Sequence, residues 1–94
     1  MPRPKKSRRI CCSPTSTYFK PRAIPMSKLQ ISTLQLDELE TIRLADFDHL
    51  SHEEGASKMK ISRATFGRIL EKARFKVADA ILNGKAIEIN LTNY

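Results

Sequence analysis

Apolar side chains recur at intervals of three and four residues along three stretches of this chain, as they do on amphipathic helices. These stretches predict helices at residues 37–48, 51–59 and 62–83. Ser51 and Glu54 have the spacing of a capping box at the start of the second helix. Ser62 can serve as the N-cap of the third helix, which would reach Gly84.

The third predicted helix has an apolar side and a basic side. Its apolar stripe consists of Phe66, Ile69, Leu70, Ala73, Val77, Ala80 and Ile81. The charged residues off this stripe are nearly all positive: Arg63, Arg68, Lys72, Arg74 and Lys76. A short helix, a tight turn and a longer helix with an apolar back and a basic front are typical of a helix-turn-helix that binds duplex DNA.

The residues around the turn fit the register of that motif. Ala56 is small where the first helix must approach the second closely, Ile61 would plug the corner, and Phe66 would anchor the second helix in the core. Lys60 stands at the turn position that glycine usually takes because its φ angle is positive. We expect this lysine to cost about 1 kcal/mol of backbone strain.

The pattern changes to strict alternation after Gly84. Ile87, Ile89 and Leu91 alternate with polar residues, which predicts a half-buried strand. A single strand needs a partner. The possible partners are residues 9–12, residues 29–33 and the same strand of a second chain. Because Phe75 and Leu82 lie off the main stripe beside this strand, we expect the second chain and therefore a homodimer.

The N-terminal third has no regular period. Residues 1–9 are polar, basic and contain two prolines, which predicts a disordered arm that either contacts phosphates or only aids solubility. Residues 10–35 predict a proline-containing loop with short strands packed on the core, including a strand at residues 10–12. Tyr18 and Phe19 are expected to pack on the core in this loop, with a base-stacking platform as the alternative.

These patterns together predict a mainly α fold. Its centre is a three-helix helix-turn-helix domain at residues 36–84, and a C-terminal strand and tail occupy residues 85–94. The formal net charge of +7 is unevenly spread. Basic blocks at residues 1–36 and 55–78 flank an acidic stretch at residues 37–54. This distribution predicts a protein that binds a polyanion, with the acidic stretch facing solvent or a protein partner.

The candidate DNA-contacting residues lie at the start of the third helix and in the basic arm. They are Ser62, Arg63, Ala64, Thr65, Gly67, Arg68 and Lys72, together with Arg3, Lys5, Lys6, Arg8 and Arg9. Arg63 could pair with a guanine edge, while Arg68 and Lys72 would bind phosphates. Gly67 either lets the helix lie closer to the duplex or allows close packing between helices.

Metal binding and catalysis have weaker support. Cys11 and Cys12 with His49 and His52 could form a metal or redox sensor, but zinc requires four ligands at suitable spacing and there is no second cysteine pair. We therefore expect no metal or cofactor. No phosphate-binding loop or nucleophile motif is present, so we expect no enzyme activity. No apolar run has the length of a membrane span, and a cytoplasmic protein is expected.

Nearly the whole chain resembles a family of small prokaryotic proteins known as domain-of-unknown-function family 134, or uncharacterised protein family 0251. The resemblance rests on PRPKKSRRI, on FKP, and on the stretch from LDELETIRLADF through SRATFGRIL to GKAIEI. It implies a helix-turn-helix similar to region 4 of bacterial sigma factors. Some members carry an additional domain similar to one that binds iron–molybdenum cofactor, which has no counterpart in these 94 residues.

The leading hypothesis is a sequence-specific transcription regulator that reads the major groove with the helix starting at Ser62. The alternative is a module that binds transcription machinery through residues 37–54. A Cys-dependent metal or redox sensor is the third hypothesis.

Overall fold

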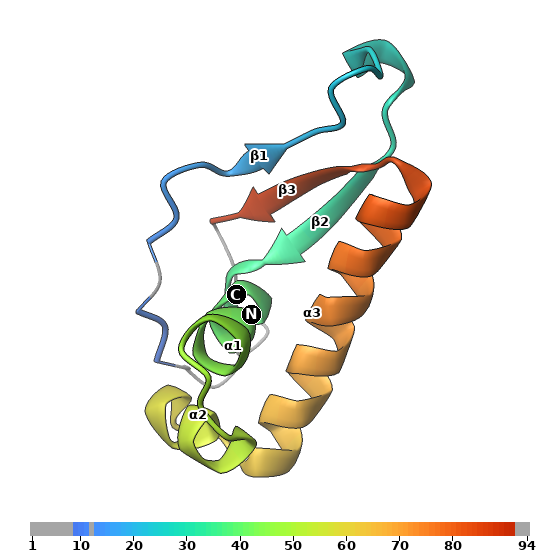
Figure 1. Cartoon of the computed structure of the whole chain (residues 1–94). Coiled ribbons are helices and arrows are strands. Elements are labelled where there is room, and N and C mark those ends of the chain that lie inside the picture. Colours follow the sequence, from blue (N-terminus) through green and yellow to red (C-terminus); the bar gives the residue numbers. More distant parts are fainter. Residues whose placement is uncertain (1–8, 12, 92–94) are drawn as a thin grey trace, which may run out of the picture.

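The structure, a computed structural model, describes residues 9–11 and 13–91 (Figure 1). It contains three helices, two short helical turns and a three-stranded sheet. The elements are β1 (Tyr18–Phe19), η1 (Met26–Lys28), β2 (Ile31–Gln35), α1 (Leu36–Ile42), η2 (Arg43–Phe47), α2 (His52–Met59), α3 (Arg63–Asn83) and β3 (Ala86–Asn90). Of the predicted basic arm, only Arg9 belongs to the described residues.

The three predicted helices are present, and their ends follow from local chemistry. At the start of α2, the Ser51 hydroxyl accepts a hydrogen bond from the Glu54 amide at 3.1 Å, and the Glu54 carboxylate accepts one from the Ser51 amide at 2.9 Å. The Ser62 hydroxyl accepts from the Thr65 amide at 3.1 Å and so caps α3. Gly84 ends α3 with a φ angle of 66°, in the left-handed region that glycine adopts without strain.

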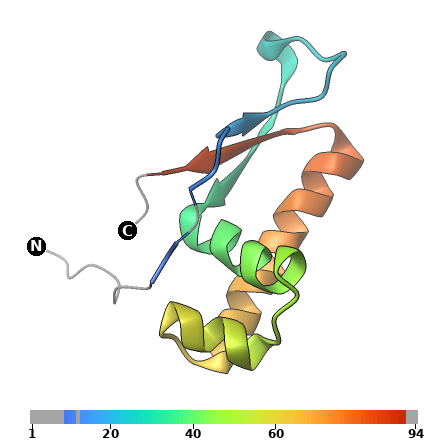
Figure 2. The ribbon, with the colours of Figure 1, turned by 60° about the vertical axis from the view of Figure 1, so that its left-hand side comes forward.

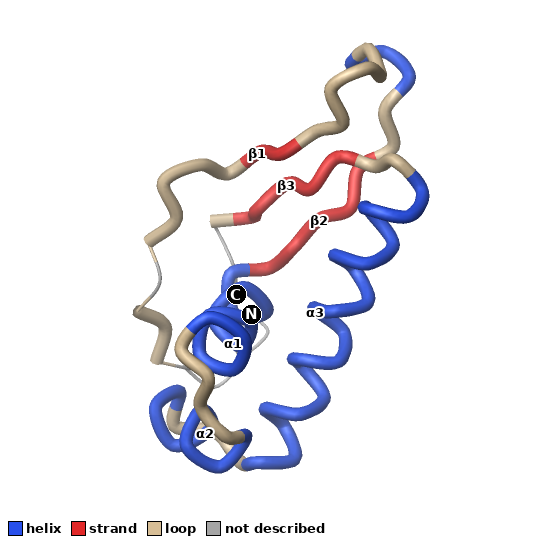
Figure 3. Tube along the Cα trace, viewed as in Figure 1, coloured by secondary structure: helices blue, strands red, loops and turns tan. Residues whose placement is uncertain are grey.

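Helix α3 is the longest element, and every other helix or sheet lies along it (Figure 3). Its N-terminal half packs against α1 and α2, and its C-terminal half packs against β2 and β3 (Figure 2). With 21 residues it extends over about 30 Å. No helix in the described part of the chain is both long and apolar enough to span a bilayer.

The sheet has the order β1-β3-β2, so the predicted C-terminal strand lies in its middle. β3 pairs in parallel with β2, where Leu34 lies opposite Ile89, and antiparallel with β1, where Tyr18 lies opposite Glu88. Residues 29–33, which overlap β2, are thus the correct partner among the three considered. Residues 9–11 are in no strand, and Cys12 is outside the described residues.

The pairing of β3 within its own chain removes one reason to expect a homodimer. β3 finds hydrogen-bonding partners on both sides within its own chain, so its backbone does not require a second copy. Ile89 is buried rather than part of an exposed patch. Phe75 and Leu82 are exposed as expected, but the homodimer itself stays a prediction.

The core consists of two clusters that meet at Ile42. One cluster joins α2 to the first half of α3, and the other joins the sheet to the middle of α3. The buried residues are Leu44, Ala56, Met59, Phe66 and Leu70 in the first cluster, and Leu34, Ala73 and Ile89 in the second. Ile81 is 72% exposed, so the apolar stripe predicted on α3 is wrong at that residue.

Helix α2 contacts the Phe66 ring of α3 closely at Gly55. A Cβ atom at this position would lie 2.5 Å from the Cζ atom of Phe66, whose ring is fully buried. Ala56 was expected to be the small residue at this contact, and it is buried in the same cluster, but Gly55 is the residue that leaves room for the ring. At Gly67 a Cβ would lie 3.6 Å from His52, which is an ordinary contact distance.

We predict that Gly55→Ala lowers the free energy of unfolding by about 1–3 kcal/mol because the methyl group overlaps the Phe66 ring. Gly67→Ala is the matched control, also within a helix, and it should leave stability unchanged or raise it by up to about 1 kcal/mol. Urea unfolding of both variants measures the difference. Equal stabilities for the two variants would contradict the proposed close contact.

Candidate nucleic-acid interface

The turn between α2 and α3 has the backbone geometry that the sequence predicted. Lys60 has φ 59° and ψ 44°, which is the left-handed conformation, and it forms the C-cap of α2. The next amide, of Ile61, donates to the Ala56 carbonyl at 3.0 Å. The Ile61 side chain packs against the core cluster that contains Phe66. The turn therefore fixes where the first residues of α3 project from the body.

The first turn of α3 lies at the surface. Ser62, Arg63 and Ala64 are exposed, and Thr65 is half-buried. The Ser62 hydroxyl also donates to the Thr65 hydroxyl oxygen at 2.8 Å, so both polar side chains are held in place. Because a cap satisfies only some of the first amides of a helix, this end retains N–H groups that can meet an anion.

The five basic residues of α3 fall into two groups. Arg63, Arg68 and Lys72 are exposed and form no ion pair with another described residue. Arg74 and Lys76 are instead paired with acids of η2 and α1. The predicted basic front is therefore confined to the first ten residues of the helix, and its extension to residues 74 and 76 is wrong.

Both paired residues connect α3 to the segment that precedes α2. The Arg74 guanidinium donates to both oxygens of Asp46, at 2.6 and 3.2 Å. The Lys76 ammonium lies 2.8 Å from Oε1 of Glu38, a side chain that is almost completely buried. These pairs neutralise the positive charge of the middle of α3 and leave that of its N-terminal part free.

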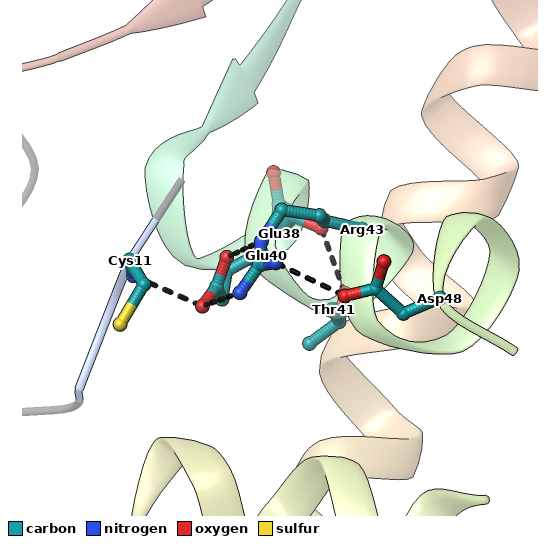
Figure 4. Close-up of polar contacts among 6 residues, drawn as sticks. All are labelled: Cys11, Glu38, Glu40, Thr41, Arg43 and Asp48. Atoms are coloured by element: carbon teal, nitrogen blue, oxygen red, sulfur yellow. Dashed lines mark hydrogen bonds and ion pairs between the residues drawn. The ribbon is translucent and has the colours of Figure 1, made fainter. Parts of the chain in front are cut away.

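The acidic stretch does not form the continuous surface that was expected. Asp37, Glu38 and Glu40 are almost completely buried, with exposed fractions of 5%, 3% and 1%. The Glu40 carboxylate accepts hydrogen bonds from Arg43 Nε at 2.7 Å and Nη2 at 3.0 Å (Figure 4). An interaction surface made of residues 37–54 would therefore lack three of its seven acids.

Gly67 is half-buried and directed towards α2, where its missing Cβ would meet His52. That distance of 3.6 Å is an ordinary contact, so close packing of α2 and α3 does not require glycine at this position. His52 itself lies against Phe66, with ring centroids 5.5 Å apart.

Little of the predicted arm is described. Arg9 is exposed, and its amide donates to the Met59 carbonyl at 3.0 Å. The other candidate residues of the arm, which are Arg3, Lys5, Lys6 and Arg8, lie outside the described residues.

The metal-site candidates are not brought together where they are described. Cys11 is an exposed free thiol and His49 is exposed, with a positive φ angle of 60°. Within residues 9–11 and 13–91, no three His, Cys, Asp or Glu side chains are arranged to hold a metal ion. Cys12 is outside these residues.

The Asp46–Arg74 pair predicts a specific pH dependence of stability. The hydrogen bonds that Arg74 donates to the Asp46 carboxylate lower the pKa of Asp46 below its ordinary value. A carboxylate with a lowered pKa in the folded state adds stability above its unfolded pKa of about 3.9, and this contribution is lost as the pH falls through the lowered folded value.

Asp46→Asn should therefore reduce the free energy of unfolding at pH 7, by no more than about 1 kcal/mol because the pair is exposed. The difference from the parent protein should shrink as the pH falls below about 3.9 and vanish once the pH is below the lowered pKa of Asp46 in the folded state. Urea unfolding at several pH values measures it, and a difference that stays constant while Asp46 becomes protonated would contradict the ion-pair explanation.

Comparison with known proteins gives relatives that are longer than this chain. The chain is 52% identical over all 94 residues to a UPF0251 protein of Desulfosudis oleivorans, of which it covers 68%, and 52% identical to one of Caldanaerobacter subterraneus subsp. tengcongensis, of which it covers 80%. It is 51% identical over 90 residues to a UPF0251 protein of Methanocella arvoryzae and covers 54% of that protein. No solved structure matches the chain.

Residues 1–94 match the family described as "Protein of unknown function DUF134". The whole-chain match and the identity to these relatives agree with each other and with the resemblance found in the sequence. The protein therefore belongs to the DUF134 family, whose curated relatives are named UPF0251 proteins.

Proposed function

We propose that this protein binds double-stranded DNA and that the N-terminal half of α3 enters the major groove. The observation that carries the proposal is the division of charge along α3. Arg63, Arg68 and Lys72 are exposed without an acidic partner among the described residues, whereas the two later basic residues are neutralised. A duplex is a polyanion that these free cations can neutralise.

The placement of the free cations suits a groove. Arg68 and Lys72 are four residues apart and so lie on one side of the helix, as does Ala64 one turn earlier. Arg63 is at the very start, next to the amides of the first turn. Phosphate contacts from Arg68 and Lys72 would orient the helix, and Arg63 could then reach the edge of a base.

The arrangement of α2, the turn and α3 supports the interpretation of these elements as a helix-turn-helix. A short helix ends at a left-handed residue, Lys60, and a longer helix begins at Ser62 with its apolar side packed on the first. This arrangement is typical of motifs whose second helix binds DNA. We therefore propose a sequence-specific transcription regulator rather than an enzyme.

Sequence preference is measured by selecting binding sites from a random pool of duplexes. The proposal predicts one enriched sequence, and a palindromic site would also support two copies binding together. Recovery of unrelated sequences at unchanged frequency would contradict sequence-specific binding.

Variants of single basic residues test the assignment within α3. Arg63→Ala should weaken binding to the preferred duplex by about 1–3 kcal/mol and relax the preference at one base pair. Lys72→Ala should instead weaken binding to every duplex and reduce the slope of log affinity against log salt by about one unit. Fluorescence anisotropy at several salt concentrations measures both effects.

Arg74→Ala is the matched control, because Arg74 lies on the same helix but is paired with Asp46. We expect its binding to remain close to that of the parent chain. If Arg74→Ala weakens binding as much as Lys72→Ala does, the face of α3 assigned to DNA is wrong.

A further inference from the structure

Lys60, in the turn between α2 and α3, has a backbone conformation that is unfavourable for lysine. Its φ angle of 59° and ψ angle of 44° lie in the left-handed region. A side chain with a Cβ atom costs roughly fivefold or more in the folding equilibrium there, which is why glycine usually ends a helix in this conformation. A strained residue that is nevertheless present points to a role of its side chain outside folding.

The fold does not use the Lys60 ammonium group. A basic side chain at the end of a helix can hydrogen-bond the last carbonyls, but here main-chain donors occupy them. The Ser57 carbonyl accepts from the Lys60 amide at 3.2 Å, and the Met59 carbonyl accepts from the Arg9 amide at 3.0 Å. The Lys60 side chain is exposed and forms no ion pair with another described residue. Its charge is therefore available to a partner.

The turn holds Lys60 close to the end of α3 that is proposed to enter the groove. Ile61 packs against the core and fixes the turn, and Arg63 is the first residue of α3. Successive Cα atoms are about 3.8 Å apart, so the Cα atoms of Lys60 and Arg63 are separated by at most about 11 Å. The major groove is about 12 Å wide, so a cation this close to a residue in the groove is near the phosphates that border it.

We propose that Lys60 binds a phosphate of the duplex beside the groove that α3 enters, and that lysine occupies this position at a cost in folding stability. This inference rests on the proposed function. The contact is a charge-assisted hydrogen bond from the ammonium group to a phosphate oxygen. Such a contact orients the protein on the duplex and carries no sequence information.

Three variants of the full chain test the phosphate contact. Lys60→Asn removes the charge but keeps a residue that tolerates the left-handed conformation, and Lys60→Arg keeps the charge. Lys28→Asn is the matched control for the loss of one exposed lysine. Lys28 lies near the other end of α3, because Ile31 soon after it pairs with Ala86 just beyond that helix. Fluorescence anisotropy measures affinity for the preferred duplex and an unrelated one between about 50 and 200 mM salt.

Lys60→Asn should bind both duplexes roughly three- to tenfold more weakly at about 50 mM salt, with a salt slope smaller by about 0.9 unit. Lys60→Arg and Lys28→Asn should stay within about twofold of the parent chain, because each keeps a cation at residue 60. Unchanged binding by Lys60→Asn, or an equal loss in Lys28→Asn, would overturn the inference and leave the proposed function standing. A parent chain without salt-dependent duplex binding would overturn both.

Urea unfolding tests the cost in stability without DNA. Lys60→Gly should shift the folding equilibrium towards the folded state by roughly two- to fivefold, because glycine adopts the left-handed conformation without steric conflict. His49→Gly is the matched comparison, since His49 is exposed and has a φ angle of 60° in the turn before α2. It should gain stability in the same way, and only Lys60→Gly should also lose affinity for the duplex. A Lys60→Gly chain that is no more stable than the parent would overturn the inference, because lysine would then cost the fold nothing.

Discussion

The carboxylates of Glu38 and Glu40 in α1 are almost completely removed from water. A buried carboxylate is stable only when it is paired and hydrogen-bonded, and each of these has found several partners. Glu38 accepts from the Gln35 amide at the start of α1 and from Lys76 in the middle of α3, and Glu40 accepts from Arg43 and from the Cys11 amide. The two side chains thus join the sheet, α1, α3 and the N-terminal segment.

The same pairing decides where positive charge remains available. The chain has a net charge of +7, and the acids of its first helical segments neutralise basic residues inside or along the body. Arg63, Arg68 and Lys72 are left without an acidic partner among the described residues, and all three lie in the N-terminal half of α3. The proposed function rests on this division of charge along α3.

Features encoded locally could be predicted, and those that depend on distant partners could not. The three helices, the Ser51 and Ser62 caps and the positive φ angle at Lys60 follow from residues within a few positions of one another. β1 has two residues and hence no detectable period, and β2 was identified only as a possible partner of β3. In the candidate site, the exposed cations at the start of α3 could be predicted. The pairing of Arg74 with Asp46 and of Lys76 with Glu38 could not, because the partners are 28 and 38 residues apart in sequence.

The most direct test of the proposed function is a titration of the ¹⁵N-labelled full chain with an unlabelled duplex of about 20 base pairs, followed by amide chemical shifts. The structure and the charge distribution predict that the largest changes occur at residues 60–72, around the turn and the first half of α3, and that the amides of β1, β2 and β3 change little. Changes absent at low salt, or confined to the sheet and the second half of α3, would contradict binding of duplex DNA by the N-terminal half of α3.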